Sequence, residues 1–150
     1  MSLRWILAAL HLLGLGIGLG AVWARARALR APLDIPGMRR VLAADAWWGI
    51  AALVWIVTGG LRAFSGFEKG TLYYVNNQLF VAKMALLLAI LLLEIGPIIA
   101  FAGWRRALRS GATPDTTRAG RLATISQVQA VLVIGMVIAA AGMARGYGGA

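Results

Sequence analysis

Four long apolar segments, separated by stretches rich in polar and basic residues, define the hydropathy pattern of this 150-residue chain. The segments cover residues 5–24, 41–61, 79–103 and 122–144. A helix needs about 20 apolar residues, at a rise of about 1.5 Å each, to cross the hydrocarbon core of a bilayer. Each segment has about that length. We therefore predict an all-α integral membrane four-helix bundle that forms one transmembrane domain over residues 1–150.

The composition supports this prediction. Hydrophobic residues make up 61% of the chain and charged residues 13%, and the mean hydropathy is +0.80. A soluble domain carries about a quarter charged residues, and a small chain cannot bury so many apolar side chains in its own core. Lipid must therefore cover the remainder. The chain has no cysteine, which excludes a disulfide, a thiol nucleophile and a cysteine-ligated metal.

A cleaved signal peptide is the alternative interpretation of the first segment, because its length and the small residue Ala24 are compatible with one. The sequence RARALR follows immediately. Arginines directly after a hydrophobic segment resist translocation. The first segment is therefore predicted to remain as a membrane helix.

The arginines predict how the bundle is oriented. Two predicted loops hold five each: Arg25, Arg27, Arg30, Arg39 and Arg40 in the first, and Arg105, Arg106, Arg109, Arg118 and Arg121 in the second. The other side has only Arg4, Arg62, Lys69 and Arg145. By the positive-inside rule, both basic loops are cytoplasmic and both termini lie outside, in the periplasm. The net charge of +10 then reflects topology and anionic lipid, and nucleic acid is not needed as a partner.

The third segment carries two charges, Lys83 and Glu94. They are eleven residues apart, which places them on one stripe of a helix. Charges within a spanning helix are costly unless they face protein or water, so this stripe is predicted to face the bundle interior. Glu94 should meet Gln127, Asp45 or a water-filled cavity. Pro97 removes a backbone donor and should bend the helix.

The first segment contains His11, the only histidine, followed by closely spaced glycines. His11, Gly14 and Gly18 share one helix face, and pairs of small residues allow helices to pack closely. Two roles for His11 remain open. It could form a hydrogen bond to a neighbouring helix, or it could act as a metal ligand or proton relay.

Asp45 is placed by the pattern near the start of the second helix, where capping and the helix dipole would stabilise it. Arg62, at the far end, is predicted to extend toward the surface. Met136 and Met143 share a face of the fourth helix, where packing or ligation would each fit.

Two polar groups follow from these depths. The outer group consists of His11, Lys83 and Met136, and the inner group of Asp45, Glu94 and Gln127. The members of the outer group can meet, and His11 and Lys83 are predicted to line one cavity, covered by the loop over residues 64–77.

Several motifs resemble known membrane families. The run DAWWG…TGGLR…EKGTLYY…F…K…LLLE…P is similar to an uncharacterised bacterial integral-membrane family of unknown function, over nearly the whole chain. His11, Lys83 and Gly59 more distantly resemble the HemJ-type protoporphyrinogen oxidases and the CopD-like membrane proteins. The chain departs from HemJ proteins in VWARARAL after the first helix and in Ser126, Gln127 and Gln129 at the fourth. The resemblance implies a multi-pass protein of the bacterial inner membrane.

The HemJ resemblance implies haem b, with functional roles for His11 and Lys83. In this hypothesis His11 ligates the iron, while Met136 or the His11 of a second subunit lies opposite, the latter in a homo-oligomer. Lys83 would bind a propionate and, with Glu94, serve as a catalytic residue. Quinone or porphyrin would be the partner in the bilayer.

The second hypothesis is a non-enzymatic membrane protein. A transporter, an ion pathway or an assembly factor would use the buried charges as a relay or as structural ion pairs. A copper permease is a weaker version, because one histidine and scattered methionines supply few soft ligands.

Overall fold

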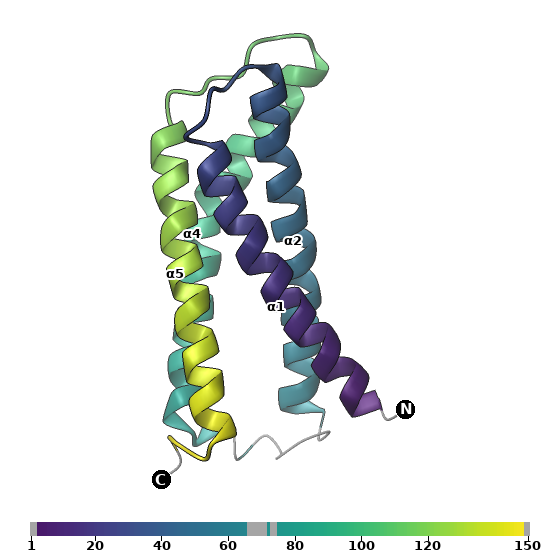
Figure 1. The fold of residues 1–150 in the computed structure, drawn as a ribbon, viewed down its shortest axis with the longest axis vertical. Helices are drawn as coiled ribbons and strands as arrows, with labels where there is room; N and C mark the ends of the chain where they lie inside the picture. The colour runs from purple at the N-terminus through teal and green to yellow at the C-terminus, as the bar shows by residue number, and fades with distance from the viewer. Residues whose placement is uncertain (1–2, 66–71, 73–74, 149–150) are drawn as a thin grey trace.

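The computed structural model describes residues 3–65, 72 and 75–148, and within them the chain is all-helical. The bundle consists of α1 (Leu3–Ala28), α2 (Ile35–Phe64), α4 (Gln78–Arg109) and α5 (Ala119–Ala144) (Figure 1). All four are long and apolar enough to cross a membrane. The prediction of an all-α bundle with four candidate spans is therefore confirmed.

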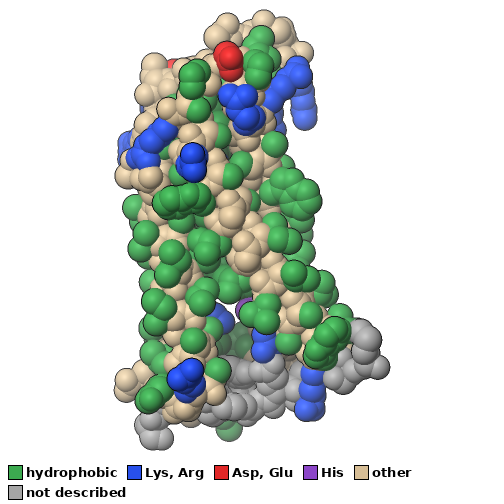
Figure 2. Space-filling view, viewed as in Figure 1, with side chains coloured by type: hydrophobic (Ala, Val, Ile, Leu, Met, Phe, Trp, Pro, Cys, Tyr) green, Lys and Arg blue, Asp and Glu red, His purple; other side chains and the backbone are tan. Residues whose placement is uncertain are grey.

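The helices run up and down, so that the α1–α2 and α4–α5 connections lie at the same end (Figure 1). We call this the basic end, defined by the connecting residues 29–34 and 110–118. Helix α1 begins and α5 ends at the opposite end. In Figure 2 most of the visible Lys and Arg side chains gather at the basic end, with a broad hydrophobic surface below them. This arrangement fits the two basic regions that the sequence predicts on one side of the membrane.

Each helix is longer than its apolar segment, because the hydropathy pattern marks only the part that lies in hydrocarbon. Helix α1 continues through Arg25 and Arg27, and Arg39 and Arg40 lie within α2. The prediction of a loop over residues 25–40 was thus wrong at both ends.

The N-terminus of α2 is capped by Asp34, whose carboxylate accepts a hydrogen bond from the Gly37 backbone N–H at 2.7 Å. Pro36 follows in the first turn, where its missing N–H costs nothing. Asp45 lies ten residues beyond Ile35, about 15 Å along the helix axis. The prediction that Asp45 stabilises the start of this helix was therefore wrong.

Close packing of α1 against α2 depends on Gly14. A Cβ atom at this position would lie 3.2 Å from the Ala51 carbonyl oxygen and from the Trp55 nitrogen. Gly18 faces Ala51 and Trp48, whereas a Cβ at Gly16 or Gly20 would meet nothing within 4 Å. Of these four glycines, only Gly14 and Gly18 therefore pack against α2. Helix α1 also contacts α5 extensively.

The start of α4 is tied to the C-terminal end of the chain. Asn77 caps the helix by accepting from the backbone N–H groups of Leu79 and Phe80, and its amide donates to the Tyr147 carbonyl at 3.2 Å. Helix α4 then continues without interruption through the buried Pro97. The predicted cover over residues 64–77 falls mostly outside the described residues.

Candidate functional site

The most buried charge in the described structure is Arg25, near the end of α1, with an exposed fraction of 0%. Its guanidinium has five N–H groups, and each makes a hydrogen bond. Nε donates to Ser126 at 3.0 Å, and Nη1 donates to Asp45 and Glu94, both at 2.8 Å. Nη2 donates to Glu94 at 2.9 Å and to Gln129 at 2.7 Å. A single side chain thus joins α1 to the three other helices.

The acidic partners of Arg25 are held by further donors. Gln129 donates from Nε2 to Glu94 at 2.7 Å and to the Ile90 carbonyl at 3.2 Å. Arg105 donates to the second oxygen of Asp45 at 2.6 Å. Two arginines therefore face two carboxylates, so the formal charges balance. We call these six residues the Arg25 cluster: Arg25, Asp45, Glu94, Arg105, Ser126 and Gln129.

Aromatic rings enclose the guanidinium. Its central carbon lies 5.9 Å from the ring centre of Trp48 and 5.6 Å from that of Phe101. Arginine is well suited to such a place, because its planar, weakly hydrated group can stack on rings while bonding at its edge. Within the described part of the chain, no buried side-chain nitrogen or oxygen lacks a hydrogen-bond partner. The desolvation cost of the buried charges is therefore offset by complete pairing.

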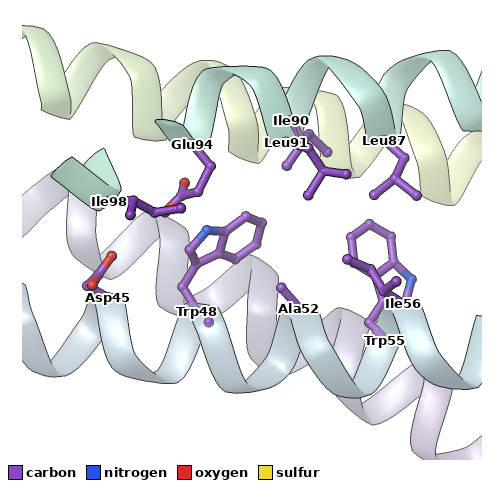
Figure 3. Close-up of a pocket in the computed structure, with 11 residues that line it drawn as sticks. Asp45, Trp48, Ala52, Trp55, Ile56, Leu87, Ile90, Leu91, Glu94 and Ile98 are labelled. Carbon is purple, nitrogen blue, oxygen red and sulfur yellow. The ribbon is translucent and has the colours of Figure 1, made fainter. Parts of the chain in front are cut away.

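A groove between α2 and α4 begins at this cluster and forms a cavity of about 150 Å³. Asp45 and Glu94 line one end of it, and their side chains are 11% and 14% exposed. Figure 3 shows them approaching from opposite helices, while the rings of Trp48 and Trp55 project from α2 toward α4. Ile56, Leu91 and Ile98 also line the cavity and are exposed on the outer surface. The α2–α4 groove therefore opens toward lipid and has an acidic inner end.

His11 lies in a second polar site, between α1 and α2 toward the opposite end. Its Nδ1 is 3.0 Å from the Trp55 carbonyl oxygen and 3.1 Å from Thr58 Oγ1. Because a carbonyl only accepts, the Trp55 contact requires Nδ1 to carry the proton. The Thr58 hydroxyl donates to the Val54 carbonyl at 2.7 Å, so its oxygen can also accept from His11. The predicted hydrogen bond from His11 to a neighbouring helix is present.

The other predicted site residues are Met136 on α5 and Lys83 on α4. Met136 is 2% exposed and packs in an apolar cluster with Trp55, Ile90 and Val133. Lys83 is partly buried on α4. Among the described residues, no group of three or more histidine and acidic side chains is placed to hold a metal ion. Ligand roles for His11, Lys83 and Met136 stay predictions.

The predicted inner group was right about Asp45 and Glu94 and wrong about the glutamine. Gln129 is buried and bonded to Glu94, whereas Gln127 is only partly buried. Two positions along a helix differ by about 200° in direction, so the two glutamines face different sides.

Arg25 was missed, since its charge was assigned to topology. A signal was present: Arg25 continues the stripe of His11, Gly14, Gly18 and Val22, at the spacing of one helix face, and every one of these residues is buried. The carboxylate of Glu94, predicted to lie inside, also implied that a nearby arginine could serve as its counterion.

Comparison with known proteins gives one match. No curated protein and no solved structure is significantly similar to the chain. The model of the family described as "Predicted membrane protein (DUF2214)" matches residues 3–148. This agrees with the predicted membership of an uncharacterised membrane family and does not extend to the HemJ or CopD families. The chain therefore belongs to the DUF2214 family of predicted membrane proteins.

Proposed function

We propose that this membrane protein binds a small lipid-soluble molecule in the α2–α4 groove, with the Arg25 cluster supplying the polar end of the site. The observation that carries this proposal is the position of Asp45 and Glu94. Both carboxylates are fully paired, yet both keep part of their surface directed into a groove that is otherwise apolar. Ligand sites characteristically combine an apolar lining with a few convergent polar groups.

The size and lining of the groove indicate what it can hold. Its volume of about 150 Å³ is large enough for one aromatic ring. Trp48 and Trp55 offer aromatic surfaces against which a ring can pack. The carboxylates can accept hydrogen bonds from hydroxyl or amino groups. A hydroxylated ring with an apolar tail, such as a quinol, has this chemistry, and its tail would extend into lipid past Ile98.

The Arg25 cluster suits a binding role because it is held rigidly. Each carboxylate oxygen of Glu94 already accepts at least one hydrogen bond, and Asp45 is fixed by two arginines. The acceptor geometry therefore exists before a ligand arrives, which lowers the entropic cost of binding.

The test uses thermal unfolding of the detergent-solubilised protein with a short-tailed ubiquinol as the probe. A ligand at a hundred times its Kd stabilises the folded state by about 2.7 kcal/mol, so the midpoint should rise by several degrees. Ala52→Phe places a phenyl ring in the groove and should abolish this rise. Leu53→Phe is the matched control, because Leu53 is 65% exposed on the lipid-facing surface.

Three results decide between the groove and its alternatives. The proposal is supported if the probe stabilises the parent protein and Leu53→Phe but not Ala52→Phe, with all three unfolding at similar midpoints without probe. An equal response of the two phenylalanine variants would contradict it, because the probe would then bind outside the groove. No response from any of the three proteins, to the quinol or to an amine-bearing ring of the same size, would contradict it as well.

A second candidate function, haem binding at His11, is favoured by one contact. With the proton held on Nδ1 by the Trp55 carbonyl, Nε2 is the nitrogen that carries a lone pair, which is the state required of an axial ligand. The distant resemblance to HemJ-type proteins points to the same residue, with Lys83 and Met136 as further contacts. His11 does not line the α2–α4 groove, so this site would be separate from it.

The haem hypothesis is tested by the absorption spectrum of protein purified from haem-replete cells. A visible haem band that disappears in His11→Ala would support it. A colourless protein that takes up no added haem would contradict it and leave the groove proposal untouched.

A further inference from the structure

We propose that the basic end of α4 binds the phosphate of an anionic phospholipid in a cup formed by Arg105, Arg106 and Arg109. These three side chains and Ala102 line a cavity of about 280 Å³. It is distinct from the α2–α4 groove, and the two share no lining residue.

The charge of the cup favours an anion. Its lining contains three arginines and no carboxylate. In the described part of the chain, neither Arg106 nor Arg109 has an acidic partner, and both are exposed. Arg105 alone is paired, through Asp45. Arginine binds phosphate oxygens in a two-pronged geometry, so this arrangement leaves at least two guanidinium groups available for one phosphate.

The position of the cup identifies a lipid as the source of that phosphate. Ile99, about one turn before Ala102 in α4, is 68% exposed on the surface that faces lipid and does not line the groove. The phosphate would therefore sit at the level where headgroups lie, with an acyl chain along Ile99 and with Ala102 leaving room for the glycerol. Basic pockets at the ends of membrane helices are recognised sites for anionic headgroups.

Arg105 connects this cup to the Arg25 cluster. The same guanidinium that lines the cup donates to Asp45 at 2.6 Å, and Asp45 in turn accepts from Arg25. A phosphate that draws Arg105 toward itself would compete with Asp45 for this donor. Headgroup binding would then change the charge at the inner end of the groove, and linkage requires the groove to affect headgroup binding equally.

Native mass spectrometry of the detergent-solubilised protein, titrated with phosphatidylglycerol or phosphatidylcholine, tests the proposal. Arg106→Gln combined with Arg109→Gln removes two charges from the cup and leaves the Arg105–Asp45 pair intact. We expect this variant to bind phosphatidylglycerol at least tenfold more weakly. Arg118→Gln combined with Arg121→Gln is the matched control, since it removes the same charge from exposed positions at the same end. It should stay within twofold of the parent protein.

Each outcome is decisive. An equal loss in both double variants would overturn the proposal, because general surface charge would then account for binding. Equal affinity for phosphatidylcholine would overturn it too. A third arm adds inorganic phosphate up to the concentration of the lipid. Displacement of the lipid by this ion at concentrations that match the lipid's own would show a site for soluble anions and refute the lipid assignment.

This inference does not depend on the proposed function. Ala52→Phe fills the groove but touches no residue of the cup. Its phosphatidylglycerol affinity should therefore differ from that of the parent protein only through the contact of Arg105 with Asp45. A parent protein that binds phosphatidylglycerol as expected but shows no ubiquinol response would refute the groove and support the cup. A parent protein that responds to ubiquinol but binds phosphatidylglycerol no better than phosphatidylcholine would do the opposite.

Discussion

The guanidinium of Arg25 and the carboxylate of Glu94 form a two-pronged ion pair in the interior of the bundle, with nitrogen–oxygen distances of 2.8 and 2.9 Å. The pair joins the end of α1 to the middle of α4. Replacing a buried ion pair with apolar side chains is often neutral, but removing one partner leaves an uncompensated charge and is strongly destabilising. The contribution of each residue to the stability of the bundle therefore depends on the presence of the other.

Arg25→Met should destabilise the bundle by about 3–5 kcal/mol, because it leaves Asp45 and Glu94 without their shared counterion. Arg25→Lys should recover only part of this loss, since an ammonium group cannot satisfy all the acceptors that surround the guanidinium. Thermal unfolding in detergent measures both. Arg27→Gln, at an exposed position two residues away, is the control. Equal midpoints for Arg25→Met and Arg27→Gln would refute the importance of the pair.

Gln129→Leu should cost about 1–3 kcal/mol, because Glu94 and Arg25 each lose a buried hydrogen bond. Gln127→Leu should be close to neutral or slightly stabilising, since Gln127 is only partly buried. The two variants make the same chemical change two positions apart. The difference between their unfolding midpoints therefore compares the buried face of α5, which carries Gln129, with the partly buried face that carries Gln127. A larger loss for Gln127→Leu would contradict the observed rotation of this helix.

Gly59→Ala should destabilise the contact between α1 and α2. The added Cβ would lie 2.9 Å from His11 Cε1, so the imidazole must shift away from the Trp55 carbonyl. We expect a loss of about 1–3 kcal/mol, typical of overpacking. Gly60→Ala is the adjacent control, because nothing lies within 4 Å of its Cβ position. The Gly59 prediction fails if both variants unfold at the midpoint of the parent protein.

The orientation of the bundle remains a prediction from the arginine distribution. If the basic end is cytoplasmic, a reporter fused after Ala150 should be active in the periplasm. A second reporter, which is active only in the cytoplasm, should be inactive when fused after Ala150. The same reporter should be active when it is inserted between residues 110 and 114. The opposite pattern of activities would invert the assignment.

The sequence alone determined the four candidate membrane spans of the described residues, their order and the interior location of Glu94. These follow from local properties: a spanning helix requires about 20 apolar residues, and a charge within it must face protein. The same local pattern underestimated helix length. Helices α1 and α2 extend through Arg27, Arg39 and Arg40, which are exposed, and α1 also extends through Arg25, whose charge is paired inside the protein.

Tertiary structure alone decided which polar residues meet. Gln127 and Gln129 differ by two positions, and only the rotation of α5 about its axis places Gln129 beside Glu94. Arg25 and Arg27 are equally basic in sequence, yet one is fully buried and the other exposed. The α2–α4 groove likewise lies between two helices that pack mainly against other neighbours, α2 against α1 and α4 against α5. Such features depend on helix rotation and spacing, which result from packing between helices and have no counterpart in the hydropathy of a single segment.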